Sequence, residues 1–347
     1  MPAISEITIN AFRGISNLKI SNLSTVNVLV GANNSGKTSV LEAIKLISDP
    51  YNFGKATNLA FLRAPAAKDK KAEKIVEATS TLYQKEIEDR QTNYLIDISA
   101  LTSLGELAYA SHGQIEEVYT STGAKKKAFS VSVKTQLGHD KPIYQNLKLT
   151  NGQDELLSQS AQPLMGMLYV HAGVSYYYAC VSILSESILN ERKKDLLGLL
   201  KSFEPSVEDI SIVGEDVYLH NSVSGTLPLY VYGTGLQKAV MLSGVLASME
   251  DGVILIDEID NAINISAFEE VFSWFVRRCK VRNIQAFLTT HSMEAIDAVL
   301  DTADPGSDDI RIITLRRLPN SHNTVARVRT GAEASADRSD FKMELRV

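Results

Sequence analysis

Polar and apolar residues alternate at the start of the chain and then change to a helical spacing. The pattern predicts a strand over residues 4–9, a short strand over 18–20 and a strand over 25–30. The third strand is largely apolar and β-branched, which is typical of a strand buried on both faces. A loop follows, and residues 38–47 then repeat apolar positions every three to four residues, as a helix does. This order of elements favours an α/β fold.

The stretch 51–165 has a different character. Charge clusters lie there between short runs in which polar and apolar residues alternate, such as 95–98 and 129–133. We expect an inserted subdomain that combines helices with antiparallel strands.

The remainder returns to the first pattern. Residues 166–170 resemble a core strand and 180–203 a helix, so we assign 166–207 to a lobe-linking strand and a small helical lobe. Strand–helix alternation then resumes from 208. We therefore predict a single domain over 1–347, whose nucleotide-binding core is 1–50 with 208–347. No heptad run is long enough for a coiled-coil arm.

Composition narrows the class of protein. Of the 347 residues, 44% are hydrophobic and 22% charged, which is ordinary for a globular chain. No run of about 18 apolar residues exists, so we expect no membrane partner, and the N-terminus lacks the features of a signal peptide. The cysteines, Cys180 and Cys279, are too few for a disulfide scaffold. These features predict a cytoplasmic protein.

The net charge of −6 argues against a protein covered in nucleic acid, although not against a local basic groove. Basic clusters occur at 68–74, 125–127, 192–194 and 277–282. Each is read as a solvated face unless several of them converge, which would make DNA contact plausible.

The loop after the third strand carries the clearest motif. Residues Gly31 to Thr38 fit G-x-x-x-x-G-K-[ST] at every fixed position. The glycines let the backbone approach phosphate, Lys37 would neutralise the β- and γ-phosphates, and Thr38 would bind Mg²⁺. A glycine turn with an exposed lysine is the alternative, but the flanking strand and helix favour the phosphate loop. The predicted ATP-binding residues here are Gly31, Asn33, Asn34, Ser35, Gly36, Lys37, Thr38 and Ser39.

A second apolar strand, 253–256, ends in Asp257 and Glu258. Parallel α/β sheets bind ligands at the carboxyl ends of their strands. Asp257 is then placed to hold Mg²⁺, and Glu258 to activate the water that attacks the γ-phosphate. The alternative is that Asp257 and Glu258 are only solvated acids at the end of a strand. The presence of a phosphate loop in the same sequence disfavours this alternative.

Two further segments complete the pattern. His291 follows a strand over 284–290, at the same expected sheet edge, where it can donate to the γ-phosphate. Gly233, Thr234 and Gly235 precede an apolar helix, and glycines at a helix start leave N–H groups free for an anion. A glycine turn entering a helix is common, so this second signal is weak by itself.

Together these motifs resemble, in order and detail, the ABC-type ATPases of the RecF/SMC-like branch. Within it they are most similar to the OLD-like ATPases of bacterial and phage-defence systems. The segments that carry the resemblance are Phe12-Arg13-Gly14-Ile15, Gly31 to Ser39, Gly233-Thr234-Gly235-Leu236-Gln237-Lys238, Leu255 to Asn261, and Thr289-Thr290-His291-Ser292. They cover residues 1–50 and 226–300 and say little about 51–165.

The resemblance implies an ABC-ATPase head with a parallel phosphate-loop sheet, an antiparallel β subdomain and a small helical lobe. It implies a homodimer or higher oligomer, in which the phosphate loop of one protomer faces the glycine turn of another across ATP. It also implies that Arg13 lies near the nucleotide.

Three departures stand out. Gly233 replaces the usual serine of the signature turn, and Asn261-Ala262-Ile263-Asn264 replaces a common Asn-Gly-Leu-His. The lobe-linking glutamine has no evident equivalent, and its best position is around 171–173. The 56 residues after His291 are too few for the Toprim nuclease domain of OLD nucleases. No guanine-reading Asn/Thr-Lys-x-Asp motif occurs, so ATP is expected rather than GTP.

Three functions stay open. The first is an ATP-driven dimeric switch that controls a separate effector protein in a bacterial defence operon, where defence rests on analogy of fold. The second is a RecF-like repair ATPase that binds duplex DNA. The third is a nucleotide-gated scaffold with little turnover.

Overall fold

The computed structural model describes most of the chain. The described residues are 2–63, 72–88, 91–119, 123–149, 162–173, 175, 180–181, 183–184, 193–303, 308–319, 323–341 and 343–346. Parts of the basic clusters 68–74 and 192–194 lie outside them.

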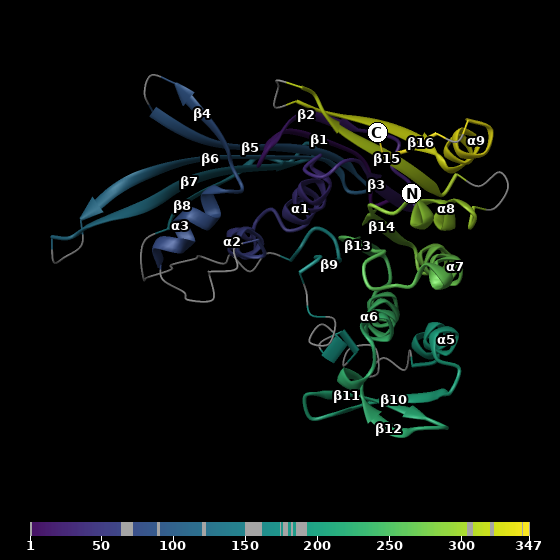
Figure 1. Cartoon of the computed structure of the whole chain (residues 1–347). Coiled ribbons are helices and arrows are strands. Elements are labelled where there is room, and N and C mark those ends of the chain that lie inside the picture. The colour runs from purple at the N-terminus through teal and green to yellow at the C-terminus, as the bar shows by residue number, and fades with distance from the viewer. Residues whose placement is uncertain are drawn as a thin grey trace.

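A mixed sheet of six strands forms the centre of the molecule (Figure 1). Across the sheet the strands are β16 (Thr324–Thr330), β15 (Ile310–Arg317), β3 (Val26–Val30), β14 (Ile284–Thr289), β13 (Gly252–Ile256) and β9 (Met167–Val170). All neighbours are parallel except β15 and β16. The carboxyl ends of β3, β13 and β14 therefore meet at one edge of the sheet.

An antiparallel sheet lies beside the first and extends away from it (Figure 1). Its strands are β2 (Ile15–Ile20), β1 (Ile4–Phe12), β5 (Gln91–Thr102), β6 (Gly105–Tyr119), β7 (Lys125–Leu137) and β8 (Ile143–Leu149), with β4 (Gln84–Glu88) paired to β5. The segment predicted as an insertion thus joins its strands to the N-terminal ones in a single sheet.

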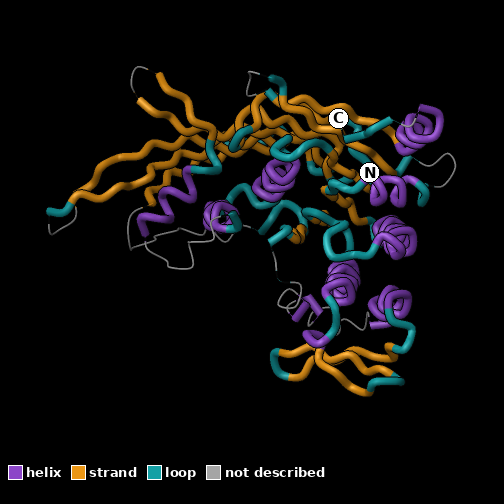
Figure 2. Tube along the Cα trace, in the orientation of Figure 1, coloured by secondary structure: helices purple, strands orange, loops and turns teal. Residues whose placement is uncertain are grey.

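Two apolar cores explain this layering. Side chains of β13 alternate between them, because Val253 and Leu255 face one core while Ile254 and Ile256 face the other. The first core places α1 (Lys37–Ile47) between the two sheets. The second packs the opposite face of the parallel sheet against helices, as Figure 2 shows. These are α6 (Thr234–Ser248), α7 (Phe268–Val281) and α8 (Met293–Leu300), and α5 (Lys193–Phe203) joins the same core by packing against α6 and α7.

The remaining elements are peripheral. Two short helices, α2 (Phe53–Phe61) and α3 (Ala72–Ser80), lie under the antiparallel sheet, and α9 (Gly331–Phe341) follows β16 (Figure 1). The longest helix in the described part of the chain is α6 with 15 residues, so no coiled-coil arm occurs there. None of the helices described is long and apolar enough to cross a lipid bilayer.

Residues 207–228 differ from the predicted strand–helix alternation. They form a separate three-stranded antiparallel sheet of β10 (Val207–Val213), β11 (Asp216–Asn221) and β12 (Gly225–Pro228). Gly214 and Gly225, both with positive φ, make the two turns that reverse the chain. Short alternating runs between turns favour hairpins, and the alternation predicted from 208 begins only with α6.

Candidate functional site

The loop between β3 and α1 has a backbone that favours glycine at both ends. Gly31 has φ +146° and Gly36 has φ +101°. A Cβ atom at Gly31 would lie 2.4 Å from the carbonyl oxygen of Leu315, so any side chain there would clash with β15. The loop leads into the first turn of α1, whose N–H groups have no partner within the helix. Such a loop can surround an anion with backbone donors.

Lys37 lies at the first position of α1 and is almost fully buried. Its ammonium donates to the carbonyl oxygens of Gly31 at 2.8 Å and Ala32 at 3.1 Å. Burial lowers the pKa of this ammonium, while the carboxylates of Asp257 and Glu258 act in the opposite direction. The only charge on this side chain is therefore held directly over the loop.

Asp257 follows β13 and contacts the loop helix directly. The Thr38 hydroxyl donates to its carboxylate, with Oγ1 3.1 Å from both Oδ1 and Oδ2. From the other side the Thr289 hydroxyl donates to Oδ1 at 2.6 Å. Its backbone N–H is also fixed, because it donates to the carbonyl of Val170 at 2.9 Å. The structure thus brings together the two residues that were predicted to bind Mg²⁺.

The oxygens of Thr38 and Asp257 fit that ion. Mg²⁺ binds oxygen ligands and usually takes only one or two protein side chains beside phosphate and water. A second observation fits an anionic ligand, since the Ser35 hydroxyl is buried and has no hydrogen-bond partner among the described residues. Bound Mg²⁺ would neutralise charge on the β- and γ-phosphates.

Glu258 adopts a backbone conformation that is uncommon for a residue with a side chain, with φ +53°. Its N–H donates to Thr289 Oγ1 at 2.8 Å, and its carbonyl oxygen accepts from Lys238 Nζ at 3.0 Å. These backbone contacts hold the strained residue in place, as functional sites often do. The Glu258 side chain lines the same hollow as the phosphate loop.

This hollow of about 290 Å³ collects most of the predicted residues. It is lined by Asn33, Asn34, Ser35, Gly36, Lys37, Thr38, Ser39, Arg63, Asp257, Glu258, Thr289 and His291. Three strand ends and one helix start contribute to it, as the sheet order requires. His291 belongs to it because it lies just beyond β14.

A buried carboxylate on α1 joins two arginines beside this hollow. Glu42 accepts from Arg63 Nε at 2.8 Å and NH2 at 2.7 Å, and it lies 2.7 Å from Arg13 Nε. Burial raises the pKa of Glu42, and both arginines oppose this effect. Arg63 also donates to the Ser39 hydroxyl at 3.3 Å.

Arg13 itself lines a neighbouring hollow of about 440 Å³. The two hollows share Asn34, Ser35, Gly36, Ser39 and Arg63. The second adds cations from Lys85 and Arg317 and hydroxyls from residues 80, 81 and 324. A ligand whose phosphates lie in the first hollow can place its other polar groups in the second.

The glycine turn does not line the phosphate hollow of its own chain. Gly233 and Thr234 are exposed at the start of α6. Gly235 lies close to the loop after Glu258, since a Cβ atom there would be 3.0 Å from the carbonyl oxygen of Ala262. The turn is therefore open to another molecule.

Lys238 ties the helix after this turn to the same loop. Its side chain is buried, and Nζ donates to the carbonyls of Glu258 and Asn261. Burial lowers the pKa of this ammonium to about 8, against the opposing effect of Asp260 and Glu258.

We expect the cost of burying this charge to appear as pH-dependent stability. Between pH 8 and 10.5 the unfolded chain binds a proton that the folded chain does not, so the free energy of unfolding rises with pH. Relative to Lys238→Met, the wild type should gain at most about 3 kcal/mol over this window. Urea unfolding at several pH values measures it, with the exposed Lys201→Met as control. A pH-independent difference between wild type and Lys238→Met would contradict the prediction.

His171 occupies the position suggested for the lobe-linking residue. It follows Val170 at the end of β9, and its Nδ1 accepts from the N–H of Gly173 at 3.2 Å. Burial lowers its pKa. It does not line the phosphate hollow, and its linking role stays a prediction.

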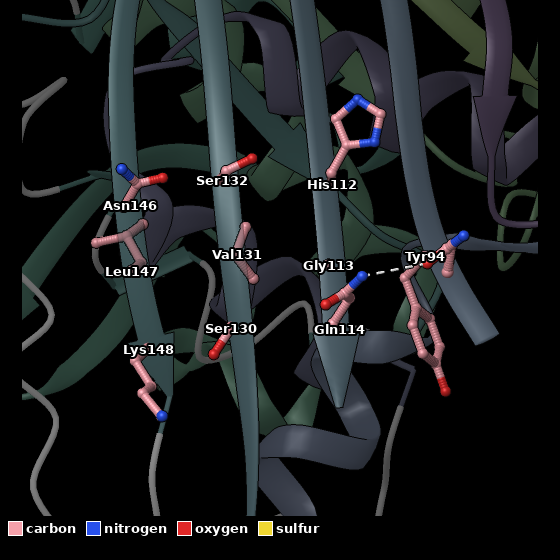
Figure 3. A pocket seen from close by; sticks show the side chains of 11 residues that line it. Tyr94, His112, Gly113, Gln114, Ser130, Val131, Ser132, Asn146, Leu147 and Lys148 are labelled. Carbon is pink, nitrogen blue, oxygen red and sulfur yellow. Dashed lines mark hydrogen bonds between the residues drawn. The ribbon is translucent and has the colours of Figure 1, made fainter. Parts of the chain in front are cut away.

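A further hollow of about 460 Å³ lies on the open face of the antiparallel sheet (Figure 3). Side chains from neighbouring strands meet there, and Gln114 donates to Asn93 at 3.3 Å. His112 and Ser132 are cross-strand neighbours in it. None of the predicted site residues lines this hollow.

Sequence reasoning missed Thr289, Glu42 and Arg63 as parts of the site. Thr289 stands in the strand-end run that contains His291, so its position offered a signal. Arg63 lies in the stretch 51–165, where no motif marks it. Glu42 is a charged residue among the buried positions of α1. A charge at such a position is uncommon, and this was the signal that the sequence offered.

Comparisons with known proteins match the chain to ATPase domain models and to curated proteins. One family model, described as "AAA ATPase domain", matches residues 3–154. A second, described as "AAA domain, putative AbiEii toxin, Type IV TA system", matches residues 160–297. A curated Helicobacter pylori protein named "ATP/GTP phosphatase" is 23% identical over 335 aligned residues, covering 86% of this chain and 87% of that protein. The RecF protein of Geobacter sulfurreducens is 47% identical over 64 residues, 18% of each chain.

Solved structures share the fold. An SMC head bound to the C-winged helix domain of ScpA has a TM-score of 0.52 at 12% identity, covering 96% of this chain and 99% of that one. An SMC head with an extended coiled coil, bound to a ScpA domain derived from Pyrococcus furiosus, has a TM-score of 0.51 at 11% identity over 99% and 100%. Models of AAA-type ATPase domains thus match the two halves of the chain, and its α/β fold is similar to that of SMC heads. The narrower OLD-family resemblance is not confirmed.

Proposed function

We propose that this chain is an ATP-dependent switch, in which two copies close over ATP and reopen after hydrolysis. The observation that carries the proposal is the contact of Thr38 with Asp257 beside Lys37, because it brings together, from two distant segments, oxygens that would hold Mg²⁺ beside bound phosphates. Lys37 and the loop N–H groups would bind the phosphates. Glu258 would accept the proton of the attacking water, and His291 would donate to the γ-phosphate.

The position of the glycine turn supports a dimer. Gly233 and Thr234 are exposed and outside the phosphate hollow of their own chain. A helix start with free N–H groups can bind phosphates held by another copy. ATP then favours closure only to the extent that the closed dimer binds ATP more tightly than the separate chains do, and reopening after hydrolysis requires that this preference be smaller for ADP.

We further propose that the switch controls a separate effector protein in bacterial anti-phage defence. The second family model, which is described as a putative toxin of a toxin–antitoxin system, supports such a setting. The SMC heads that are bound to a ScpA domain support a protein partner.

Contact with duplex DNA is the second candidate. The short but 47% identical match to a RecF protein favours it. ATPase activity that rises with added DNA and falls with salt would distinguish it from the effector switch.

Complementation between two inactive variants tests the composite site. Gly233→Glu places a carboxylate opposite the phosphates of the partner, and a Cβ at Gly233 meets nothing within 4 Å, so the fold should tolerate it. Lys37→Ala damages only the phosphate loop. Each variant alone should hydrolyse almost no ATP. An equal mixture should recover roughly a quarter of wild-type turnover, since half the dimers are mixed and each holds one complete site.

The matched control is Gly233→Ala, which adds a methyl group without charge and should hydrolyse ATP alone. If the mixture stays inactive while both variants fold and Gly233→Glu still binds ATP, the composite site is wrong. If Gly233→Glu alone hydrolyses ATP at the wild-type rate, the site is complete within one chain.

A further inference from the structure

Residues 343–346 form a short segment that is anchored on the parallel sheet. Leu345 is fully buried, and its carbonyl oxygen accepts from the Thr314 hydroxyl of β15 at 2.7 Å. Arg329 of β16 donates to the same hydroxyl at 2.9 Å. The residue next to Leu345 therefore starts from a fixed backbone position.

That residue, Arg346, reaches the strand-end histidine. Its NH1 donates to the carbonyl oxygen of His291 at 2.7 Å. The other edge of the guanidinium is engaged by Glu344, with Nε 2.6 Å from Oε1 and NH2 2.7 Å from Oε2. Because the guanidinium is planar, the contacts along its Nε–NH2 edge fix its orientation. In this orientation NH1 points toward the carbonyl oxygen of His291.

The same segment is fastened to the helix that follows His291. Arg338 pairs with Asp297 of α8 through two contacts of 2.7 and 2.6 Å, and its NH1 donates to the carbonyl of Met343 at 3.1 Å. His291 lies between β14 and α8, in a stretch without regular structure. Arg338, in α9, thus links the segment 343–346 to α8, while Arg346 holds the peptide that precedes this helix.

We propose that Arg346 is a positioning residue that keeps the His291 side chain directed into the phosphate hollow. A carbonyl held at 2.7 Å by a preorganised donor restricts rotation of the peptide between His291 and Ser292. The direction of the imidazole depends on that peptide. Arg346 does not line the hollow, so it acts through His291 and not on the nucleotide. The proposal rests on the ATPase function proposed above.

Loss of the donor should lower turnover and spare binding. In Arg346→Ala, kcat for Mg-ATP hydrolysis should fall about tenfold, since a catalytic group displaced by about 1 Å can cost up to a hundredfold. KM should stay within about twofold, because the phosphate loop carries the binding. Arg346→Lys keeps a donor but loses the fork and should lie between the two. His291→Asn sets the lower limit of the series.

Histidine NMR supplies a readout that does not depend on turnover. The chain contains six histidines, and His291→Asn identifies the Cε1–H signal of His291. In the nucleotide-free protein, Arg346→Ala should shift or broaden this signal and leave that of His112, on the distant sheet, unchanged. If the wild type hydrolyses no ATP, the proposed function fails while the NMR result still decides the role of Arg346.

The control is Arg327→Ala, an exposed arginine on the neighbouring β16. Equal losses of kcat in both alanine variants, or an unchanged His291 signal in Arg346→Ala, would overturn the proposal. If Arg346→Ala does not fold, Glu344→Gln decides, because it frees the guanidinium and leaves Leu345 in place. It should change kcat and the His291 signal in the same direction but less, and no change in either would overturn the proposal.

Discussion

Replacing Lys37 with alanine is expected to abolish nucleotide binding at micromolar concentrations. The ammonium is buried and held over the phosphate loop by the carbonyls of Gly31 and Ala32. Removing one partner of a buried charge pair typically costs 2–5 kcal/mol, so we expect the Kd for ATP to rise roughly 100-fold or more. Isothermal titration calorimetry with Mg-ATP measures the change.

A half-buried lysine on the same helix provides the matched control. Lys45 lies further along α1, its pKa is also lowered by burial, and it donates to the carbonyl of Met167 at 3.4 Å. It does not line the phosphate hollow. Lys45→Ala should therefore bind ATP as the wild type does. Wild-type affinity in Lys37→Ala would remove the phosphate-loop assignment.

Replacing Glu258 with glutamine is expected to stop hydrolysis and to trap the ATP-bound dimer. The amide keeps the size of the side chain but cannot accept the proton of the attacking water, and a general base is worth about 10²–10⁴ in rate. The structure predicts little disturbance elsewhere. The contacts that Thr289 and Lys238 make with this residue use its backbone N–H and carbonyl, which the substitution leaves intact.

Single-turnover hydrolysis and light scattering at micromolar protein test the two parts separately. The control is Glu269→Gln, an exposed carboxylate in the first turn of α7, which should behave as the wild type. Wild-type hydrolysis by Glu258→Gln would return this residue to a structural role. A variant that is inactive yet monomeric in ATP would leave the base assignment standing and refute the dimer.

Sequence predicted best those elements whose residue pattern has a single physical explanation. β3 and β13 are apolar along their whole length because both of their faces are buried, and such runs have few alternatives. The phosphate loop has fixed glycines because its backbone requires positive φ at Gly31 and Gly36. The site at the sheet edge followed from the rule for parallel strands.

The contacts that sequence reasoning missed are those between segments far apart in the chain. Arg13 and Arg63 both pair with the buried carboxylate of Glu42, but no periodicity links residues 21 and 29 positions apart. Arg346 contacts a carbonyl 55 positions away, and backbone acceptors carry no sequence signal at all. The sheet over 207–228 was missed because strand–helix alternation was extended past the turn glycines.

The position of α1 between two sheets has a mechanical consequence. Leu107 of β6 packs in the same core as α1, and the strand continues to Tyr119, which at about 3.4 Å per residue is about 40 Å away. The β6–β7 hairpin therefore extends well beyond the core that holds α1, the helix that begins at the phosphate loop. If the near end of the hairpin tilts by about 5°, the far end moves by about 3.5 Å, given a 40 Å arm. A small tilt within this core is therefore enlarged along the hairpin toward Tyr119.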